Sequence, residues 1–206
     1  MKALLINGSP HKDGTTARAL TELANELLRE GVAAEIINVG SLPVSGCVAC
    51  GYCKKNGKCV FDDIVNEAAA KFKEADALIV GSPVYYASPN GTLISFLDRL
   101  FHSSTFDKSM KIGASVVCAR RGGCSASFDM LNKYFTISSM PIAASTYWNM
   151  VHGASAADAE LDLEGLETMR NLARNIAFLI KSIALGKEKY GMPLREKSNV
   201  TNFIKR

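Results

Sequence analysis

Four of the six cysteines lie in one short segment, between residues 47 and 59. Their spacing is C-x2-C-x2-C-x5-C, and the lysines among them favour the thiolate form. Four thiolates in a compact run can ligate a [4Fe–4S] cluster. Tetrahedral zinc, a dithiol redox centre, and thiols that line a site without binding metal are the alternatives. The predicted metal ligands are Cys47, Cys50, Cys53 and Cys59.

A second group of polar residues follows the first apolar segment, in NGSPHKDGTT at residues 7–16. Ser9, Thr15 and Thr16 offer hydroxyl groups, and Gly8 and Gly14 let the backbone approach a ligand closely. A helix that begins here adds free N–H groups and a partial positive charge, which suits a phosphate. The alternative is an ordinary helix N-cap made by Thr15 or Thr16.

Two further loops carry residues that suit a planar or anionic ligand, GSPVYYASPNG at 81–91 and CARRGGC at 118–124. The adjacent Tyr85 and Tyr86 cannot both be core residues, and one of them can stack on or edge a flavin ring. Arg120 and Arg121 can meet an anionic or electron-rich ligand. For the first of these loops the alternative is that one tyrosine packs under the loop and the other is merely exposed. For the second it is a basic turn that is simply solvated. Cys118 is expected in the core.

Regular elements must position these loops. Continuous apolar runs predict buried strands, and apolar residues at helical spacing predict helices between them. This alternation predicts an α/β fold, a flavodoxin-like doubly wound five-stranded parallel sheet of order 2-1-3-4-5 with helices on both faces. In such a sheet the loops after strands one, three and four meet at one edge. The predicted strands cover residues 3–6, 33–39, 77–80, 112–117 and 141–146, and residues 41–60 are predicted to be a loop.

Several classes of protein lack support in the sequence. No G-x-x-x-x-G-K-[ST] motif is present, and the first turn lacks G-x-G-x-x-G, which argues against nucleoside triphosphatases and dinucleotide-binding folds. No acidic residue follows strand one and no aspartate ends strand three, unlike in response regulators. A nucleophilic cysteine followed by arginine is absent from the first loop, unlike in phosphatases of similar fold.

The charge distribution separates a neutral body from a basic end. The net charge is +4, and residues 186–206 carry that whole excess, so we expect no nucleic-acid partner. No apolar run approaches the roughly 18 residues of a membrane span, and the first residues do not read as a signal peptide. We therefore expect a cytoplasmic protein without a membrane partner. Its predicted parts are one domain at 1–185 and a basic C-terminal tail at 186–206.

The loops and the cysteine segment together resemble a known family. The chain is similar to the flavodoxin-like NADPH-dependent FMN reductase family, and within it to the iron–sulfur flavoproteins. The resemblance covers about residues 1–185 and is carried by the segments quoted above, together with FLDRLF at 96–101. It implies FMN as cofactor, NADH or NADPH as electron donor, and assembly as a homodimer or homotetramer.

The resemblance also assigns roles by position. It implies a phosphate-binding loop, a loop bordering the isoalloxazine ring and a third flavin loop. Their residues are Ser9, His11, Thr15 and Thr16 in the first, Pro83, Val84, Tyr85 and Tyr86 in the second, and Ala119, Arg120, Gly122 and Gly123 in the third.

Three functions are compatible with these features. The first is an FMN-dependent oxidoreductase that moves electrons from NAD(P)H to flavins, quinones or similar small acceptors, with no catalytic side chain because the cofactor carries the chemistry. The second is an iron–sulfur flavoprotein that transfers electrons through FMN and a [4Fe–4S] cluster to or from a redox protein. The third is a non-catalytic FMN-binding or redox-sensing protein.

Overall fold

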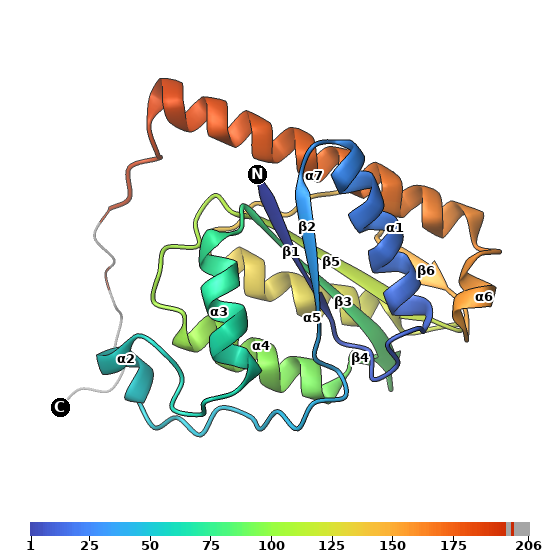
Figure 1. The fold of residues 1–206 in the computed structure, drawn as a ribbon, viewed down its shortest axis with the longest axis horizontal. Helices are drawn as coiled ribbons and strands as arrows, with labels where there is room; N and C mark the ends of the chain where they lie inside the picture. The colour runs from blue at the N-terminus through green and yellow to red at the C-terminus, as the bar shows by residue number, and fades with distance from the viewer. Residues whose placement is uncertain (197–198, 200–206) are drawn as a thin grey trace.

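Five parallel strands form the centre of the molecule (Figure 1). The computed structural model of the chain describes residues 1–196 and 199. The strand order β2-β1-β3-β5-β6 is the predicted order 2-1-3-4-5 counted along the parallel strands. A sixth strand, β4 (Ser88–Pro89), pairs antiparallel with the end of β3. The parallel strands are β1 (Lys2–Asn7), β2 (Ala33–Asn38), β3 (Ala77–Tyr85), β5 (Ile112–Ala119) and β6 (Met150–His152).

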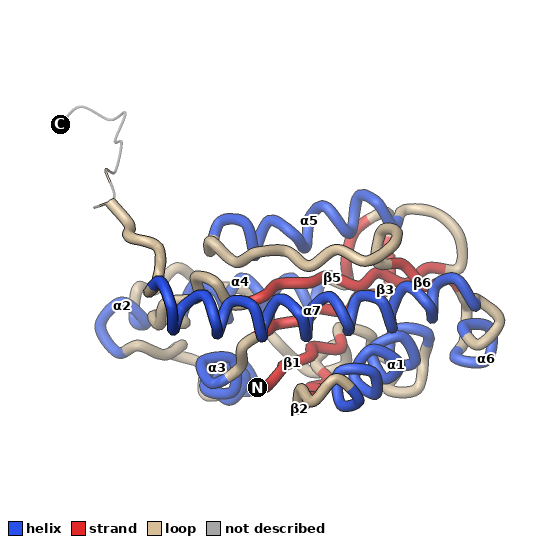
Figure 2. Tube along the Cα trace, turned by 90° about the horizontal axis from the view of Figure 1, so that it is seen from above, coloured by secondary structure: helices blue, strands red, loops and turns tan. Residues whose placement is uncertain are grey.

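Helices cover both faces of the sheet, as the apolar strands predict. Helices α1 (Thr15–Arg29) and α7 (Leu163–Tyr190) bury their apolar sides in one core, and α7 runs along the front of the sheet in Figure 2. Helices α3 (Ile64–Glu74), α4 (Gly91–Ser103) and α5 (Cys124–Ile137) form a second core on the opposite face. The two short helices are α2 (Tyr52–Asn56) and α6 (Ala156–Ala159).

The fifth strand, predicted over residues 141–146, was placed wrongly. Only an isolated bridge joins Ile142 to Gly113, and β6 begins at Met150. Before β6, the side-chain amide of Asn149 donates to the Ser115 carbonyl at 3.0 Å, and the Asn149 carbonyl accepts from the N–H of Val117 at 3.0 Å. A side chain thus replaces a backbone ladder bond here, which an apolar pattern does not reveal.

Two other segments differ from the expected elements. Helix α2 lies inside residues 41–60, between Gly51 and Gly57, which both have a left-handed backbone with φ of 69° and 68°. Helix α7 continues to Tyr190, so the first residues of the predicted tail 186–206 are helical. Residues 197–198 and 200–206 of that tail lie outside the described residues. None of the helices within residues 1–196 has the length and apolar character that a membrane crossing requires.

Candidate functional site

Loops at the carboxyl ends of the parallel strands are hydrogen-bonded to one another. The N–H of Gly8 donates to the Gly81 carbonyl at 2.8 Å, and the Asn90 side-chain amide donates to the Gly8 carbonyl at 2.7 Å. The N–H of Gly153, which follows β6, donates to the Ala119 carbonyl at 3.1 Å. The three loops singled out in the sequence therefore share one edge of the sheet.

The loop after β1 is shaped by its own side chains. Asn7 is fully buried, and its Oδ1 accepts the N–H of Ser9 at 3.0 Å. The buried Ser9 then accepts the N–H of His11 on its Oγ at 3.1 Å, while the His11 side chain is exposed. These two bonds fix the course of the loop as it approaches α1.

Helix α1 begins at an uncapped N-terminus. Its N-cap residue is Gly14, which has no side chain, so neither threonine acts as the cap. The Thr15 hydroxyl lies 3.1 Å from the carbonyls of both Gly153 and Ser155, and the Thr16 side chain is buried. Among the described residues, no acceptor takes the first N–H groups of α1. Free N–H groups at a helix start suit an anion such as a phosphate.

Helix α5 begins in the same way at Gly123, whose φ of 91° is strained for residues with a side chain. A Cβ there would lie 2.9 Å from Val84 Cγ1 and 3.0 Å from Ala87 Cα, so glycine lets the second and third loops touch. The other helices longer than eight residues have capping side chains, which are Asp63 for α3, Asn90 for α4 and Asp162 for α7. The two uncapped starts therefore belong to two of the predicted flavin loops.

A tight turn joins β3 to β4 and presents both tyrosines to solvent. Tyr85 pairs with Ser88, and the two residues between them, Tyr86 and Ala87, have φ of 52° and 58°. Two positive φ values define a type I′ turn, which normally contains glycine or asparagine. Tyr85 is partly exposed and Tyr86 is fully exposed, so neither packs under the loop. Both aromatic rings are therefore available to a ligand, and Pro83 and Val84 are half-buried beside them.

The loop after β5 presents unpaired positive charge. Arg120 and Arg121 are exposed, and neither forms an ion pair within the part of the chain that the structure describes. The carbonyl of Ala119 lies 3.2 Å from Nδ1 of His152, which places the imidazole beside this loop. Gly122 is exposed. Which of the twelve predicted residues contact FMN stays a prediction, although all twelve lie in the three loops or in the strand and helix ends that adjoin them.

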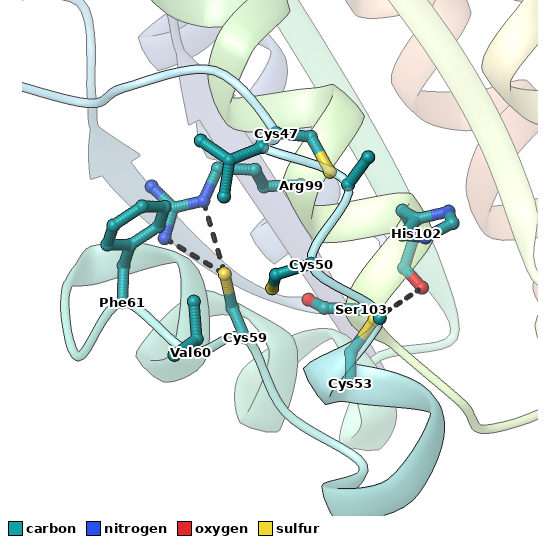
Figure 3. A pocket seen from close by; sticks show the side chains of 12 residues that line it. Cys47, Cys50, Cys53, Cys59, Val60, Phe61, Arg99, His102 and Ser103 are labelled. Carbon is teal, nitrogen blue, oxygen red and sulfur yellow. Dashed lines mark hydrogen bonds between the residues drawn. The ribbon is translucent and has the colours of Figure 1, made fainter.

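The four clustered cysteines line a single pocket, separate from these loops (Figure 3). Cys47 and Cys50 are exposed, Cys59 is half-buried and Cys53 is buried. The Cys53 thiol lies 3.9 Å from the carbonyl of His102. Cys118 and Cys124 lie in the cores and not in this pocket. Burial raises the pKa of Cys118 to about 12, so this thiol is inert, as expected.

Arg99 forms part of the wall of the cysteine pocket. Its side chain is 1% exposed, and its Nε and Nη2 donate to the sulfur of Cys59 at 3.3 Å and 3.2 Å. The same guanidinium donates two hydrogen bonds to the Asp63 carboxylate, of 2.7 Å and 2.9 Å, and lies 4.8 Å from the centre of the Phe61 ring. Burial alone lowers the pKa of Arg99, but Asp63 and Cys59 outweigh it and raise that pKa. Arg99 is therefore a buried cation directed at a cysteine sulfur.

The pocket suits a cluster better than a single ion. Among the described residues, no three His, Cys, Asp or Glu side chains lie close enough to hold one metal ion. In a [4Fe–4S] cluster each thiolate binds a different iron, so the thiols must surround a volume instead of meeting at a point. Here the four cysteines line one pocket that is open to solvent, as binding through four separate thiolates requires. The buried Ser103 hydroxyl beside them has no partner among the described residues, which leaves a donor for a sulfur atom.

Sequence reasoning missed three residues of these sites, which are Asn90, Arg99 and Ser103. Asn90 had a usable signal, since asparagine before an apolar helical repeat is a typical N-cap. Arg99 stands within FLDRLF, where the sequence alone does not show that a guanidinium is buried. Ser103 offers no pattern at all, because its importance comes from the pocket that it lines.

Comparisons with known proteins agree with this geometry. A family model for NADPH-dependent FMN reductase matches residues 1–155. An iron–sulfur flavoprotein of Methanocaldococcus jannaschii is 33% identical over 191 residues, covering 89% of this chain and 99% of the relative. An iron–sulfur flavoprotein of Methanosarcina thermophila is 28% identical over 194 residues, covering 92% of this chain and 100% of the relative.

A solved structure is also similar in fold. The apo form of an NADH:FMN oxidoreductase superposes with a TM-score of 0.64 at 21% identity, covering 86% of this chain and 88% of that one. At this level of identity the likeness concerns the fold.

Proposed function

The chain belongs to the NADPH-dependent FMN reductase family, and from that premise we propose that it is an iron–sulfur flavoprotein that transfers electrons between FMN and a [4Fe–4S] cluster. The observation that carries this proposal is the pocket in which four cysteines meet a buried arginine. The similar proteins named iron–sulfur flavoproteins support it, because they align along nearly their whole length.

FMN would bind at the edge where the three loops meet. The uncapped start of α1, with Ser9 beside it, would take the phosphate, because free N–H groups and a helix dipole favour an anion. Tyr85 and Tyr86 would border the ring system, and Arg120 would lie near its polar edge. The strained type I′ turn fits this role, since strain in backbone geometry gathers at ligand sites.

The cluster would bind Cys47, Cys50, Cys53 and Cys59. When bound, FMN exchanges electrons singly or in pairs, and a [4Fe–4S] cluster exchanges them one at a time. The protein's own part is to hold both groups and to set their electrostatic surroundings. Helix α4 begins directly after its cap Asn90, beside the flavin loops, and carries Arg99 and Ser103 into the cysteine pocket. This helix therefore connects the two sites within one chain.

A second candidate function is hydride transfer from NAD(P)H to FMN. The exposure of Tyr86, Arg120 and Arg121 favours it, since a nicotinamide nucleotide needs open access to the flavin and positive charge for its phosphates. A flavin, a quinone or a similar small molecule would then accept the electrons. The two functions are compatible in one protein, and they differ in the natural electron donor.

The proposed setting is the cytoplasm, where reducing conditions keep the cysteines as thiols. We also propose that the chain forms a homodimer or homotetramer. Exposed apolar side chains support this, among them Tyr147 and Trp148, whose rings lie 5.3 Å apart, and Phe178 and Leu185 on α7. Neither nucleic acid nor a membrane is a proposed partner.

Anaerobic purification tests the main proposal. The expected protein contains FMN together with iron and sulfide in a ratio of about four each per chain. Cys50→Ser should lose the iron and keep the FMN, whereas the matched control Cys118→Ala, in the core, should keep both. Iron-free wild-type protein prepared without oxygen would refute the cluster. Steady-state oxidation of NADPH or NADH by the wild type tests the second candidate, which fails if neither nucleotide is consumed.

A further inference from the structure

The C-terminal half of α4 contributes polar groups to the cysteine pocket. Arg99 and Ser103 are four residues apart, so they share one face of the helix. Both line the pocket together with the four cysteines, as Figure 3 shows. Each is almost completely buried, with exposed fractions of 1% for Arg99 and 3% for Ser103. Burying a guanidinium and a hydroxyl is costly unless both have partners.

The five N–H donors of Arg99 are fully used. Nη1 faces Asp63 and the Ser45 carbonyl, Nη2 faces Asp63 and Cys59, and Nε faces Cys59. Two of the five donors thus point at one sulfur atom. A neutral thiol is a weak acceptor, whereas a thiolate is a strong one. Two donors aimed at one sulfur therefore suit a cysteine that ligates a cluster.

Ser103 provides the second donor. Its Oγ is buried and has no hydrogen-bond partner within the part of the chain that the structure describes. A buried hydroxyl without a partner destabilises the fold, because it gives up its hydrogen bonds to water and gains none. Sulfur atoms of a ligand held by the neighbouring cysteines are suitable acceptors for it. The hydroxyl is thus explained by a group that fills the pocket.

Given the proposed function, on which this step depends, we infer that Arg99 and Ser103 are positioning residues that raise the reduction potential of the cysteine-bound cluster by donating hydrogen bonds to its sulfur atoms. Reduction adds one electron, and therefore one negative charge, to the group in the pocket. Donors and a buried cation stabilise the more negative state more strongly. Hydrogen bonds to sulfur are among the features that set the potential of such clusters.

Asp63 must then lower the reduction potential of the cluster. Its carboxylate neutralises part of the Arg99 charge, so removing the negative charge should raise the potential further. Asp63→Asn is a mild change, because asparagine is also a good N-cap for α3 and can still accept one N–H from Arg99. A purely structural ion pair predicts no such change of sign, since both substitutions would only loosen the pocket.

The test is a dithionite titration, followed by visible and electron paramagnetic resonance spectra, of wild type and four variants. Arg99→Lys and Ser103→Ala should shift the cluster midpoint to more negative potentials, and Asp63→Asn should shift it to more positive ones. Arg29→Lys, at an exposed position on α1, is the matched control and should cause no shift. The FMN midpoint serves as an internal reference.

Iron and sulfide contents distinguish failure of the proposed function from failure of the inference about the reduction potential. A wild type that binds no iron removes the proposed function itself. A wild type with a full cluster whose midpoint is the same in Ser103→Ala, Asp63→Asn and Arg99→Lys overturns the inference alone. If Arg99→Lys loses its cluster, the midpoint potentials of Ser103→Ala and Asp63→Asn still test the inference. Shifts of opposite sign support it, and shifts of equal sign refute the role of Arg99.

Discussion

The side-chain amide of Asn90 donates a 2.7 Å hydrogen bond to the carbonyl of Gly8, so the loop after β3 is tied to the loop after β1. The same side chain caps α4 by accepting the N–H of Thr92 at 2.9 Å. The N–H of Asn90 donates to Ser82 Oγ at 3.0 Å. One buried residue therefore joins two of the proposed flavin loops to the helix that leads to the cysteine pocket.

Substitution of Asn90 should separate capping from loop coupling. Asn90→Ser keeps an N-cap oxygen for α4 but removes the amide donor to Gly8, and we expect a loss of about 1–2 kcal/mol in unfolding free energy. Asn90→Ala removes both and should cost about 1 kcal/mol more. Urea unfolding measures the stability, and FMN fluorescence quenching measures affinity. Unchanged FMN affinity in Asn90→Ser would contradict the coupling role.

A capping residue at Gly14 should have opposite effects on the apoprotein and on FMN binding. Gly14 has an extended backbone with φ of −86°, which residues with a side chain adopt freely. A Cβ there would lie 3.2 Å from Cβ of the exposed His11, so a small shift of His11 lets Asp fit and its carboxylate cap α1. We expect Gly14→Asp to stabilise the apoprotein by about 0.5–1 kcal/mol, through the cap and the helix dipole. FMN affinity should fall at least tenfold, because the carboxylate occupies and repels the phosphate position.

Gly14→Asn is the control for this effect, since it caps α1 without adding charge. It should weaken FMN binding less than Gly14→Asp does. Riboflavin, which lacks the phosphate, distinguishes the cause, because its binding should hardly change in either variant. Equal losses for riboflavin and FMN would place the phosphate elsewhere.

The turn between β3 and β4 stores strain at Ala87, whose φ is 58°. Ala87→Gly should relieve it and stabilise the apoprotein by about 0.5–1 kcal/mol, since glycine adopts this conformation freely. Ala87→Val, with a β-branched side chain, should instead destabilise the protein. Urea midpoints of the two variants check the sign, and a stabilising valine would show that the turn is not strained.

Acid should weaken the contact between α1 and α7. Glu26 is buried on α1 and pairs with Arg29 at 2.9 Å and with Arg174 of α7 at 2.7 Å. Burial by itself raises the pKa of Glu26, but the two arginines outweigh it and hold that pKa below the ordinary value. The ion pairs of Glu26 therefore stabilise the fold fully at pH values above the pKa of glutamate in the unfolded chain, about 4.3–4.5. This contribution is lost as the pH falls from that value through the lower pKa of the folded protein.

Glu26→Gln should therefore cost about 1–2 kcal/mol at pH 7. The difference from wild type should shrink as the pH falls below about 4.5, because the carboxylate of the unfolded chain binds a proton there, and it should vanish once the pH is below the lower pKa of the folded carboxylate. Thermal unfolding at several pH values measures this. A difference between the two proteins that stays constant down to pH 3 would contradict the assigned pairs.

Local patterns were enough for the parallel order of the sheet and for the meeting of three loops at its edge. Apolar runs and helical repeats alternate along the chain, and right-handed crossovers leave few ways to arrange them. The misplaced fifth strand marks the limit of such patterns. Residues 141–143 pair with β5 only at Gly113, and the chain then leaves the sheet until Asn149, whose side-chain amide bonds to Ser115 before β6 begins. An apolar pattern does not reveal this interruption.

The fold class and the spacing of the cysteine segment could be predicted, because both follow from residues that are neighbours along the chain. What surrounds those cysteines depends on contacts between distant segments. Cys59 and Arg99 are 40 residues apart, and they meet only because α4 packs against α3 and against the segment that carries the cysteines. Burial then turns an arginine of ordinary sequence context into a cation that faces a sulfur atom, since the surrounding core removes the water that would otherwise solvate it.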